Sequence, residues 1–266
     1  MNDQEYIQLN KASWNQRVKP HIESDFYKND QFMEGMNSLN QIELDLLGDL
    51  SGKKVAHLQC HFGQDTISLS RLGAEAWGLD LSDEAVSEAQ KLADACKSNA
   101  QFVCGDVYKS SELLPNDFDM VFSSYGTIGW LPELDSWAKA IHDILKPGGE
   151  FVFAEFHPVI WMMDDPVDTI EYNYFNDGPI RETQEGTYAD READIKLEYI
   201  TWNHSLSEVF EALFKQGFTI NAFHEFDYSP YACFQGVEEF EPGKFRIKKH
   251  ENRLPLVYSL KATKPH

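Results

Sequence analysis

The stretch that decides the fold runs from Val55 to Ser82 and reads VAHLQCHFGQDTISLSRLGAEAWGLDLS. It predicts a buried strand, a turn centred on Gly63, a helix, and a second strand that ends at Asp80. Asp80 lies about twenty residues beyond the start of the turn, at the carboxyl end of a strand. At that position a nucleotide-binding α/β sheet hydrogen-bonds the ribose of its cofactor.

The turn in this stretch is poor in glycine. A dinucleotide-binding loop uses three glycines, one of which lets the backbone approach a pyrophosphate closely. Here only Gly63 stands where such a loop would have them. We therefore expect a ligand that does not need the backbone pressed against a pyrophosphate.

Composition and charge exclude several classes of partner. Hydrophobic residues make up 42% and charged residues 25% of the 266 residues, as in an ordinary soluble globular protein. The net charge of −21 argues against nucleic acid and anionic membranes, which require clustered Lys and Arg. No stretch is long enough to span a membrane, and the N-terminus does not resemble a secretory signal. These features predict a cytoplasmic protein that acts on small molecules.

The cysteines and histidines do not predict a metal site. The four cysteines have no paired spacing, which argues against both a disulfide framework and zinc: Cys60, Cys96, Cys104, Cys233. His57 and His61 are four residues apart, but on a strand and its turn that spacing does not place them on one face. His57 is expected to be a buried, hydrogen-bonded histidine, and His61 is expected to face a ligand.

Strands and helices alternate from Lys53 onward. The expected strands are Lys53–Gln59, Ala76–Leu79, Gln101–Cys104, Asp119–Ser123 and Glu150–Glu155. The expected helices are Asp65–Leu72, Asp83–Cys96 with Ser82 as N-cap, and Glu133–Leu145, which the sequence KPGG ends. This order predicts a parallel sheet with helices on both faces.

The flanking segments have a different pattern. Residues 1–35 are rich in aromatic residues and predict short helices or a cap, and Met36–Leu50 has helical spacing. Ile170–Phe175 and Ile195–Trp202 alternate around a turn near Glu185 and Gly186, which predicts an antiparallel β-arm.

The C-terminal part returns to the sheet. Ser205 and Glu208 form a capping box that begins a helix, and Gly217 ends this helix. Phe218–Glu225 and Leu256–Ala262 are expected as late strands. Aromatic residues suggest lids in two places, the N-terminal segment and Phe226–Phe234: Trp14, Tyr27, Tyr228, Tyr231.

Five motifs in order resemble the class I S-adenosylmethionine-dependent methyltransferases. They are LQCHFGQDT at 58–66, the strand-end Asp80, CGDV at 104–107, FDMVFSSYG at 118–126 and LKPGGEFVF at 145–153. The motif LQCHFGQDT resembles the loop of a bacterial subgroup of this family, in which the same sequence replaces the usual glycine-rich loop. The resemblance covers nearly the whole chain and includes the late helix that ends before Gly217 and Phe218.

The resemblance implies a fold and a domain organisation. The fold is a Rossmann-like α/β fold with a seven-stranded, mostly parallel sheet, helices on both faces and an antiparallel last strand at Leu256–Ala262. A single methyltransferase domain of residues 1–266 would comprise an N-terminal helical cap (1–50), a cofactor-binding core (51–158), an inserted β-arm (159–204) and a C-terminal part (205–266). The exposed arm is a candidate contact for a homodimer.

The resemblance also implies the cofactor and its site. S-adenosylmethionine has a ribose and an adenine but no phosphate, and its carboxylate can lie near amides at a helix N-terminus. Asp80, with Leu81 beside it, would bind the ribose; Asp106 and the Val107 amide would bind the adenine. Gln59 and His61 stand at two glycine positions of the family, so Gln59, His61 and Gly63 would contact the methionine end.

Two residues are candidates for catalysis. Ser124 and Tyr125, at the end of the fourth strand, would lie beside the sulfonium and the methyl acceptor. His157 follows the fifth strand and is a candidate base, as is Tyr125, if the acceptor must lose a proton. His157 is equally well read as a loop histidine held by backbone.

The predicted reaction is methyl transfer to a small-molecule acceptor, which attacks the sulfonium methyl in line. Two other readings stay open at this point. One is a non-catalytic protein that binds S-adenosylmethionine or a nucleotide on the same fold, because the loop glycines are replaced. The other is an NAD(P)-dependent oxidoreductase, against which the missing G-x-G-x-x-G and the LKPGG strand entry argue.

Overall fold

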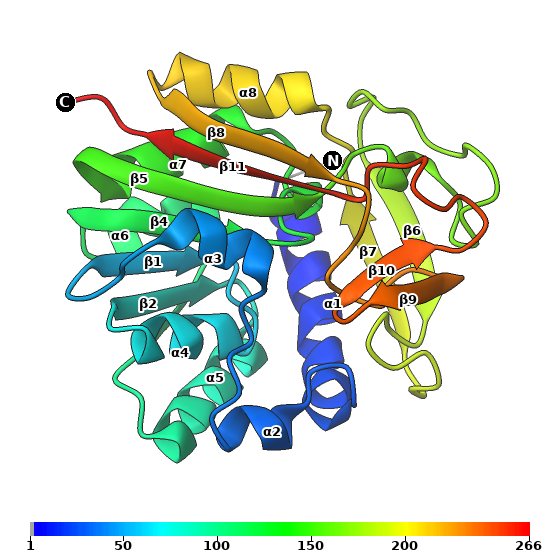
Figure 1. Ribbon diagram of the computed structural model, residues 1–266, viewed down its shortest axis with the longest axis horizontal. Coiled ribbons are helices and arrows are strands. Elements are labelled where there is room, and N and C mark those ends of the chain that lie inside the picture. The colour runs from blue at the N-terminus through cyan, green and yellow to red at the C-terminus, as the bar shows by residue number, and fades with distance from the viewer. Residues whose placement is uncertain (1–2) are drawn as a thin grey trace.

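A seven-stranded sheet forms the centre of the protein (Figure 1). The computed structural model describes residues 3–266. The strands of the sheet are β1 (Lys54–Leu58), β2 (Glu75–Asp80), β3 (Gln101–Cys104), β4 (Phe118–Ser124), β5 (Leu145–Phe156), β8 (Thr219–Phe226) and β11 (Val257–Thr263). Their order across the sheet is β3-β2-β1-β4-β5-β11-β8, and only β11 runs antiparallel to its neighbours. The predicted fold class is confirmed.

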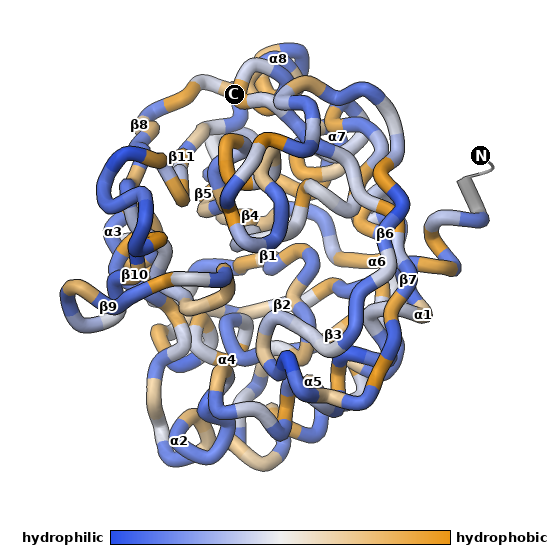
Figure 2. The backbone as a smooth tube through the Cα atoms, turned by 90° about the vertical axis from the view of Figure 1, so that its right-hand side faces the viewer, coloured by the Kyte–Doolittle hydropathy of each residue, from blue (hydrophilic) through white to orange (hydrophobic). Residues whose placement is uncertain are grey.

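Helices cover both faces of the sheet. On one face lie α3 (Gln41–Leu47), α4 (Gln64–Arg71) and α5 (Asp83–Cys96); on the other lie α6 (Ser110–Leu113), α7 (Asp135–Ile144) and α8 (Leu206–Lys215). Alternate residues of each strand face opposite layers. Val121 and Phe153 pack with α7 and α8, whereas Met120 and Val152 pack with α3, α4 and α5. Figure 2 shows hydrophobic segments in the central strands.

The turn after β1 explains why its single glycine is kept. Gly63 has a φ of 85° and is the residue before α4. A Cβ at this position would lie 2.6 Å from the Phe102 ring and 2.9 Å from the Ala89 Cβ. Both the left-handed backbone and the close approach of neighbouring side chains therefore require glycine here.

The N-terminal segment is more helical than the sequence pattern predicts. It consists of α1 (Asp3–Glu23), α2 (Asn29–Met33) and α3. The predicted helix Met36–Leu50 is longer than the observed α3, because Asn40 is extended and Gly48 adopts a positive φ. α1 is fixed to the arm through Asn10, whose side chain bonds the backbone N–H and C=O of Ile200 at 2.9 and 2.8 Å.

The arm is present, but its first strand was placed wrongly. The hairpin is formed by β6 (Ile180–Glu185) and β7 (Lys196–Thr201), which pair antiparallel. The predicted strand Ile170–Phe175 is irregular and makes only an isolated bridge at Ile170. The alternation of apolar and polar residues in Ile170–Phe175 does not correspond to a buried face, because Ile170 and Phe175 are exposed. The sequence of β6 is polar because both faces of this strand are largely accessible to solvent.

Two features near the C-terminus also differ from expectation. A second hairpin, β9 (Val237–Glu241) and β10 (Lys244–Ile247), was not predicted, although Pro242 and Gly243 mark its turn. The helix cap at Ser205 forms as predicted, with the Glu208 N–H donating to Ser205 Oγ at 3.2 Å. The reciprocal half of the capping box is replaced, since the Glu208 carboxylate lies 3.0 Å from His204 Nδ1.

Candidate cofactor and acceptor site

One large cavity lies at the carboxyl ends of β1, β2 and β4. Its volume is about 1070 Å³, which exceeds the usual range for a pocket that holds one small ligand. The walls come from α1, the turn after β1, the segments after β3 and β4, the arm, and residues 230–234. Nine of the ten predicted site residues line it: Gln59, His61, Gly63, Asp80, Leu81, Asp106, Val107, Ser124, Tyr125.

Asp80 lies at the end of β2 with its carboxylate held by backbone amides. The His61 N–H donates to Oδ2 at 2.7 Å and the Ser82 N–H donates to Oδ1 at 2.8 Å. Burial raises the pKa of Asp80 to about 6. Each carboxylate oxygen has a second lone pair, so the group can still accept hydrogen bonds from a pair of hydroxyls.

Asp106 occupies the equivalent place after β3. Its Oδ1 accepts a hydrogen bond from the Tyr108 N–H at 3.0 Å, which caps the short turn Val107–Lys109. Val107 is buried, and Leu81 follows Asp80 on the neighbouring strand. The two acids and the two apolar residues thus form one wall of the cavity, suited to a flat, polar-edged ring and a ribose.

The side chains that replace the loop glycines fasten the turn to its surroundings. Gln59 and His61 both have positive φ, at 57° and 51°. The Gln59 side-chain amide donates to the Thr127 carbonyl at 2.8 Å, and His61 Nε2 lies 2.8 Å from His21 Nδ1 on α1. The loop is therefore tied both to the segment after β4 and to the cap.

His57 and His61 are both neutral inside the protein. Burial lowers the pKa of each ring to about 3. His57 is hydrogen-bonded to Thr66 Oγ1 at 2.9 Å, as expected for a buried histidine. Among the described residues, no group of three His, Cys, Asp or Glu side chains is arranged to hold a metal ion, and the four cysteines are free.

The segment after β4 carries Ser124 and Tyr125. Ser124 Oγ donates to Asp65 Oδ2 at 3.3 Å, and burial raises the pKa of Asp65. Tyr125 has a φ of 43°, and its buried hydroxyl lies near the carboxyl of Glu43 on α3; among the described residues neither this hydroxyl nor Glu43 Oε2 has a hydrogen-bond partner. Glu43 is completely buried, and burial followed by the charge of Asp65 raises its pKa to about 8.

Glu155 holds the next three residues in place. Its carboxylate accepts hydrogen bonds from the Thr127 N–H at 2.7 Å, the Thr127 hydroxyl at 3.0 Å and the Ile128 N–H at 3.3 Å, and also from the Gly126 N–H. This buried acid fixes the backbone that forms the cavity floor beside Tyr125. No sequence pattern predicts this role, because Glu155 stands at the polar end of an apolar strand.

His157 lies away from the cavity. It is buried, its Nε2 is 2.9 Å from Glu225 Oε1 on β8, and its Nδ1 accepts from the Val159 N–H at 3.2 Å. Burial lowers the pKa of His157. Both ring nitrogens are engaged within the protein and neither faces the cavity, so the geometry supports the loop-histidine reading rather than that of a base.

Aromatic residues close the cavity from the cap, the arm and the segment 230–234. Trp14, Tyr27, Trp130 and Tyr231 all line it, whereas Tyr228 does not. The Tyr27 and Tyr188 hydroxyls lie 2.5 Å apart and join the cap to the arm. The sequence pattern singles out neither Asp65, which lines the cavity from the start of α4, nor Tyr188, which only the tertiary fold brings to it; Glu43 lies outside the lining.

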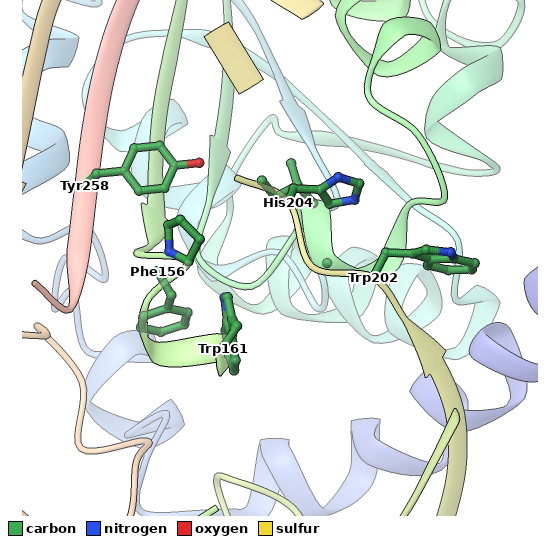
Figure 3. A pocket seen from close by; sticks show the side chains of 8 residues that line it. Phe156, Trp161, Trp202, His204 and Tyr258 are labelled. Atoms are coloured by element: carbon green, nitrogen blue, oxygen red, sulfur yellow. The ribbon is translucent and has the colours of Figure 1, made fainter. Parts of the chain in front are cut away.

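A second, very small cavity lies beside the large one (Figure 3). Its volume of about 10 Å³ is near the least that holds a water molecule. Phe156, Trp161 and Tyr258 lie on one side of it, and His204 and Trp202 lie on the other. It is too small for a cofactor or an acceptor, so the large cavity is the candidate site.

Comparison with known proteins agrees with this geometry. Residues 55–149 match a family model described as a methyltransferase domain. An uncharacterized methyltransferase of Synechocystis is 33% identical over 138 residues, which are 50% of this chain and 61% of that protein. A ubiquinone biosynthesis O-methyltransferase of Ralstonia nicotianae is 27% identical over 127 residues, 46% of this chain and 52% of that protein.

Solved structures share the fold over most of the chain. An S-adenosylmethionine-dependent methyltransferase from Clostridium acetobutylicum covers 95% of this chain and 99% of its own, with a TM-score of 0.59 and 16% identity. The comparisons thus show that residues 55–149 are similar to methyltransferase domains and that the chain shares the fold of S-adenosylmethionine-dependent methyltransferases. The chain spans about half to three-fifths of the relatives' length, so the activity of the whole protein is a matter for proposal.

Membrane insertion by a helix finds no support in the structure. Across residues 3–266, none of the helices combines the length and the apolar character that crossing a bilayer requires.

Proposed function

We propose that this protein transfers the methyl group of S-adenosylmethionine to a small-molecule acceptor inside the large cavity. The observation that carries the proposal is the convergence of Asp80 and Asp106 with the turn around Gly63 on one cavity. Residues that follow successive strands in the sequence lie close together in the structure, because the carboxyl ends of parallel strands meet at one edge of a sheet. The volume of about 1070 Å³ leaves room for an acceptor beside the cofactor.

The residues present fit the cofactor. Asp80 would accept hydrogen bonds from the ribose hydroxyls, and Asp106 with the Val107 amide would bind the adenine edge, while Leu81 and Val107 pack on its faces. Gln59, His61 and Gly63 would border the methionine end. Histidines 57 and 61 add no positive charge near a sulfonium, since burial lowers the pKa of both to about 3.

The bound cofactor supplies an electrophilic methyl group for in-line displacement, and the protein supplies position and a dry environment. Ser124 and Tyr125 border the region where acceptor and methyl would meet. The aromatic lids Trp14, Tyr27 and Tyr231 would exclude water, which strengthens electrostatic contacts inside the cavity. Holding the two reactants in one geometry accounts for most of the acceleration expected from such a site.

Tyr125, rather than His157, is the group we propose for handling a proton. Burial keeps its pKa well above the ordinary value, so the hydroxyl stays protonated and would orient the acceptor by a hydrogen bond. Behind it, Glu43 has a pKa of about 8 and gains the ionised form only in mildly alkaline solution. An acceptor that must lose a proton would pass it through Tyr125 to Glu43.

Calorimetric titration tests the proposal and separates it from the two other readings. S-adenosylmethionine, S-adenosylhomocysteine and NADH are titrated into the same protein. Binding of S-adenosylmethionine and S-adenosylhomocysteine, with no binding of NADH, supports the methyltransferase. Transfer of tritium from labelled cofactor to a pool of acceptors then distinguishes an enzyme from a binding protein. Absence of binding by S-adenosylhomocysteine would refute the proposal.

A further inference from the structure

Arg17 is a buried cation in the wall of the proposed cofactor and acceptor cavity. It lies on α1, lines the cavity, and is only 2% exposed. Its guanidinium carbon is 5.2 Å from the ring centre of Trp14, 5.4 Å from that of Trp130 and 4.9 Å from that of Tyr199. Three aromatic rings from the cap, the segment after β4 and the arm therefore hold the guanidinium plane.

The charge of Arg17 is not neutralised by the protein. Among residues 5–266 no carboxylate lies within 4 Å of the guanidinium, and its hydrogen bond runs from Nη1 to the hydroxyl of Ser13. By contrast, Arg181 and Arg246 pair with carboxylates at 2.7 and 2.6 Å. A buried, unpaired charge is costly, and burial accordingly lowers the pKa of Arg17.

The groups nearest to Arg17 do not compensate for its charge. The pKa of His21 is lowered to about 2 and that of His61 to about 3, by burial first and by the neighbouring charges next, so both rings are neutral. His61 Nδ1 is buried without a hydrogen-bond partner. The region therefore combines one positive charge with a neighbouring neutral ring whose second nitrogen has no hydrogen-bond partner.

Arg71 shows what a purely structural arginine looks like in this protein. Its guanidinium lies over the Phe32 ring at 4.3 Å, and its nitrogens donate to the Met36 and Phe32 carbonyls at 2.9 and 3.0 Å. Aromatic contact there accompanies hydrogen bonds from both Nη atoms to backbone carbonyls. Arg17 has the aromatic contacts but only the Ser13 hydroxyl as an acceptor, which leaves most of its planar fork available to a ligand.

We propose that Arg17 binds a carboxylate group of a ligand in this cavity. The guanidinium fork matches a carboxylate with two parallel N–H···O bonds, and burial among aromatic rings strengthens such a pair. Two ligands of the proposed reaction can supply the carboxylate: the methionine end of the cofactor, or an acidic acceptor. The inference rests on the proposed function for its ligands, but the site itself is defined by the residues of this chain.

The first arm of the test asks whether the carboxylate belongs to the cofactor. S-adenosylhomocysteine and 5′-methylthioadenosine, which lacks the amino-acid end, are titrated calorimetrically into wild type, Arg17→Gln, Arg17→Lys and Arg191→Gln. Arg191 is the matched control, since it lines the cavity but is exposed and 3.7 Å from Asp165. A cofactor carboxylate on Arg17 makes Arg17→Gln bind S-adenosylhomocysteine about 30-fold or more weakly. Binding of 5′-methylthioadenosine then stays within twofold.

The second arm asks whether the carboxylate belongs to the acceptor. Benzoate and its neutral analogue benzamide are titrated into each protein saturated with S-adenosylhomocysteine. An acceptor site makes the wild type prefer benzoate by about tenfold or more, as a charge-assisted pair requires. Arg17→Gln then loses this preference while its affinity for S-adenosylhomocysteine is unchanged, and Arg191→Gln retains it.

Unchanged binding of S-adenosylhomocysteine by Arg17→Gln, together with equal benzoate and benzamide binding by the wild type, would overturn the proposal. Circular dichroism checks that each variant folds. If Arg17→Gln does not fold, Arg17→Lys decides, because it keeps the charge and loses the fork: equal behaviour to wild type in both arms contradicts the site. A wild type that binds neither nucleoside refutes the proposed function instead, and benzoate titration of the free protein still tests Arg17.

Discussion

The two halves of the large cavity are built in different ways. The half around Asp80 and Asp106 comes from the ends of adjacent strands, and its polar contacts are made largely by backbone amides such as those of His61 and Ser82. The opposite half comes from side chains of the cap, the arm and the segment 230–234. Its contacts join residues far apart in sequence, such as Tyr27 and Tyr188.

This difference separates a preorganised region from an adaptable one. Strand ends in a packed sheet would position the proposed cofactor-binding acids largely independently of the lids, because the sheet is packed against buried residues on both faces. The lid half depends on a few hydrogen bonds and ring contacts between separate elements. We therefore expect damage to the first half to abolish cofactor binding, and damage to the second to alter rates and acceptor choice.

Gly63→Ala should have the largest effect, because it attacks the preorganised half at its tightest point. The new Cβ would meet Phe102 at 2.6 Å and Ala89 at 2.9 Å in a left-handed backbone. We expect the free energy of unfolding to fall by about 3 kcal/mol, measured by denaturant titration. Gly178→Ala, with a φ of +108° and open space, isolates the backbone cost at about 1 kcal/mol. Equal losses in the two variants would contradict the packing argument.

Asp80→Ala should follow, with its main effect on cofactor binding and a smaller loss of stability, because the His61 and Ser82 amides lose their acceptor. Loss of a charge-assisted pair of hydrogen bonds to the ribose weakens S-adenosylhomocysteine by about 10- to 100-fold in calorimetry. Asp83→Ala is the control, since Asp83 is three residues away, exposed, and 2.8 Å from Lys11. Affinity unchanged in Asp80→Ala would remove the ribose assignment.

Glu43→Gln should trade activity for stability. A pKa raised from 4.5 to about 8 means that the folded state holds a proton that the unfolded state releases, so this group destabilises the fold progressively between pH 4.5 and 8. The variant should melt about 5 °C above wild type at pH 8 and near wild type at pH 4.5.

The same variant tests the proton route. If the acceptor loses a proton through Tyr125, the wild-type kcat/KM should rise between pH 7 and 9, and Glu43→Gln should flatten this rise. A rise that persists in the variant assigns the proton to another group. A melting temperature below that of wild type at pH 8 would contradict the raised pKa.

Tyr188→Phe should have the smallest effect, because it removes one contact of the adaptable half. The Tyr27 hydroxyl loses its partner at 2.5 Å, and the free energy of unfolding should fall by about 1 kcal/mol. Binding of S-adenosylhomocysteine should change less than in Asp80→Ala, with faster dissociation measured by stopped flow. A loss of affinity equal to that of Asp80→Ala would show that the lids, rather than the strand ends, dominate cofactor binding.

The same division explains what could be predicted from the sequence. The strand–turn–helix around Gly63, the acids that end β2 and β3, and the capped helices depend on local spacing, so the sequence analysis located them. The arm strand Ile170–Phe175 was wrong because exposure, rather than alternation, decides whether such a run pairs. Tyr188 could not be found, since it reaches the cavity only through tertiary packing, and Glu43 approaches Tyr125 only in the folded protein.

Arg17, which the sequence patterns above do not single out, has a detectable helical spacing with its neighbours. Trp14, Arg17 and His21 are spaced three and four residues apart, which places them on one face of α1. A helical reading of the first 25 residues would have brought them together. Because residues 1–35 show no clear helical period as a whole, their pattern predicts only short helices or a cap and does not connect Arg17 with a ligand.

Hydrogen–deuterium exchange with and without S-adenosylhomocysteine measures whether the ends of β1, β2 and β3 bind this cofactor. We expect slower exchange in residues 59–65, 80–82 and 105–108, with a smaller change in the lids at 14–28. NADH at the same concentration should leave these segments unchanged. Unaltered exchange at the strand ends, or equal protection by NADH, would contradict this expectation.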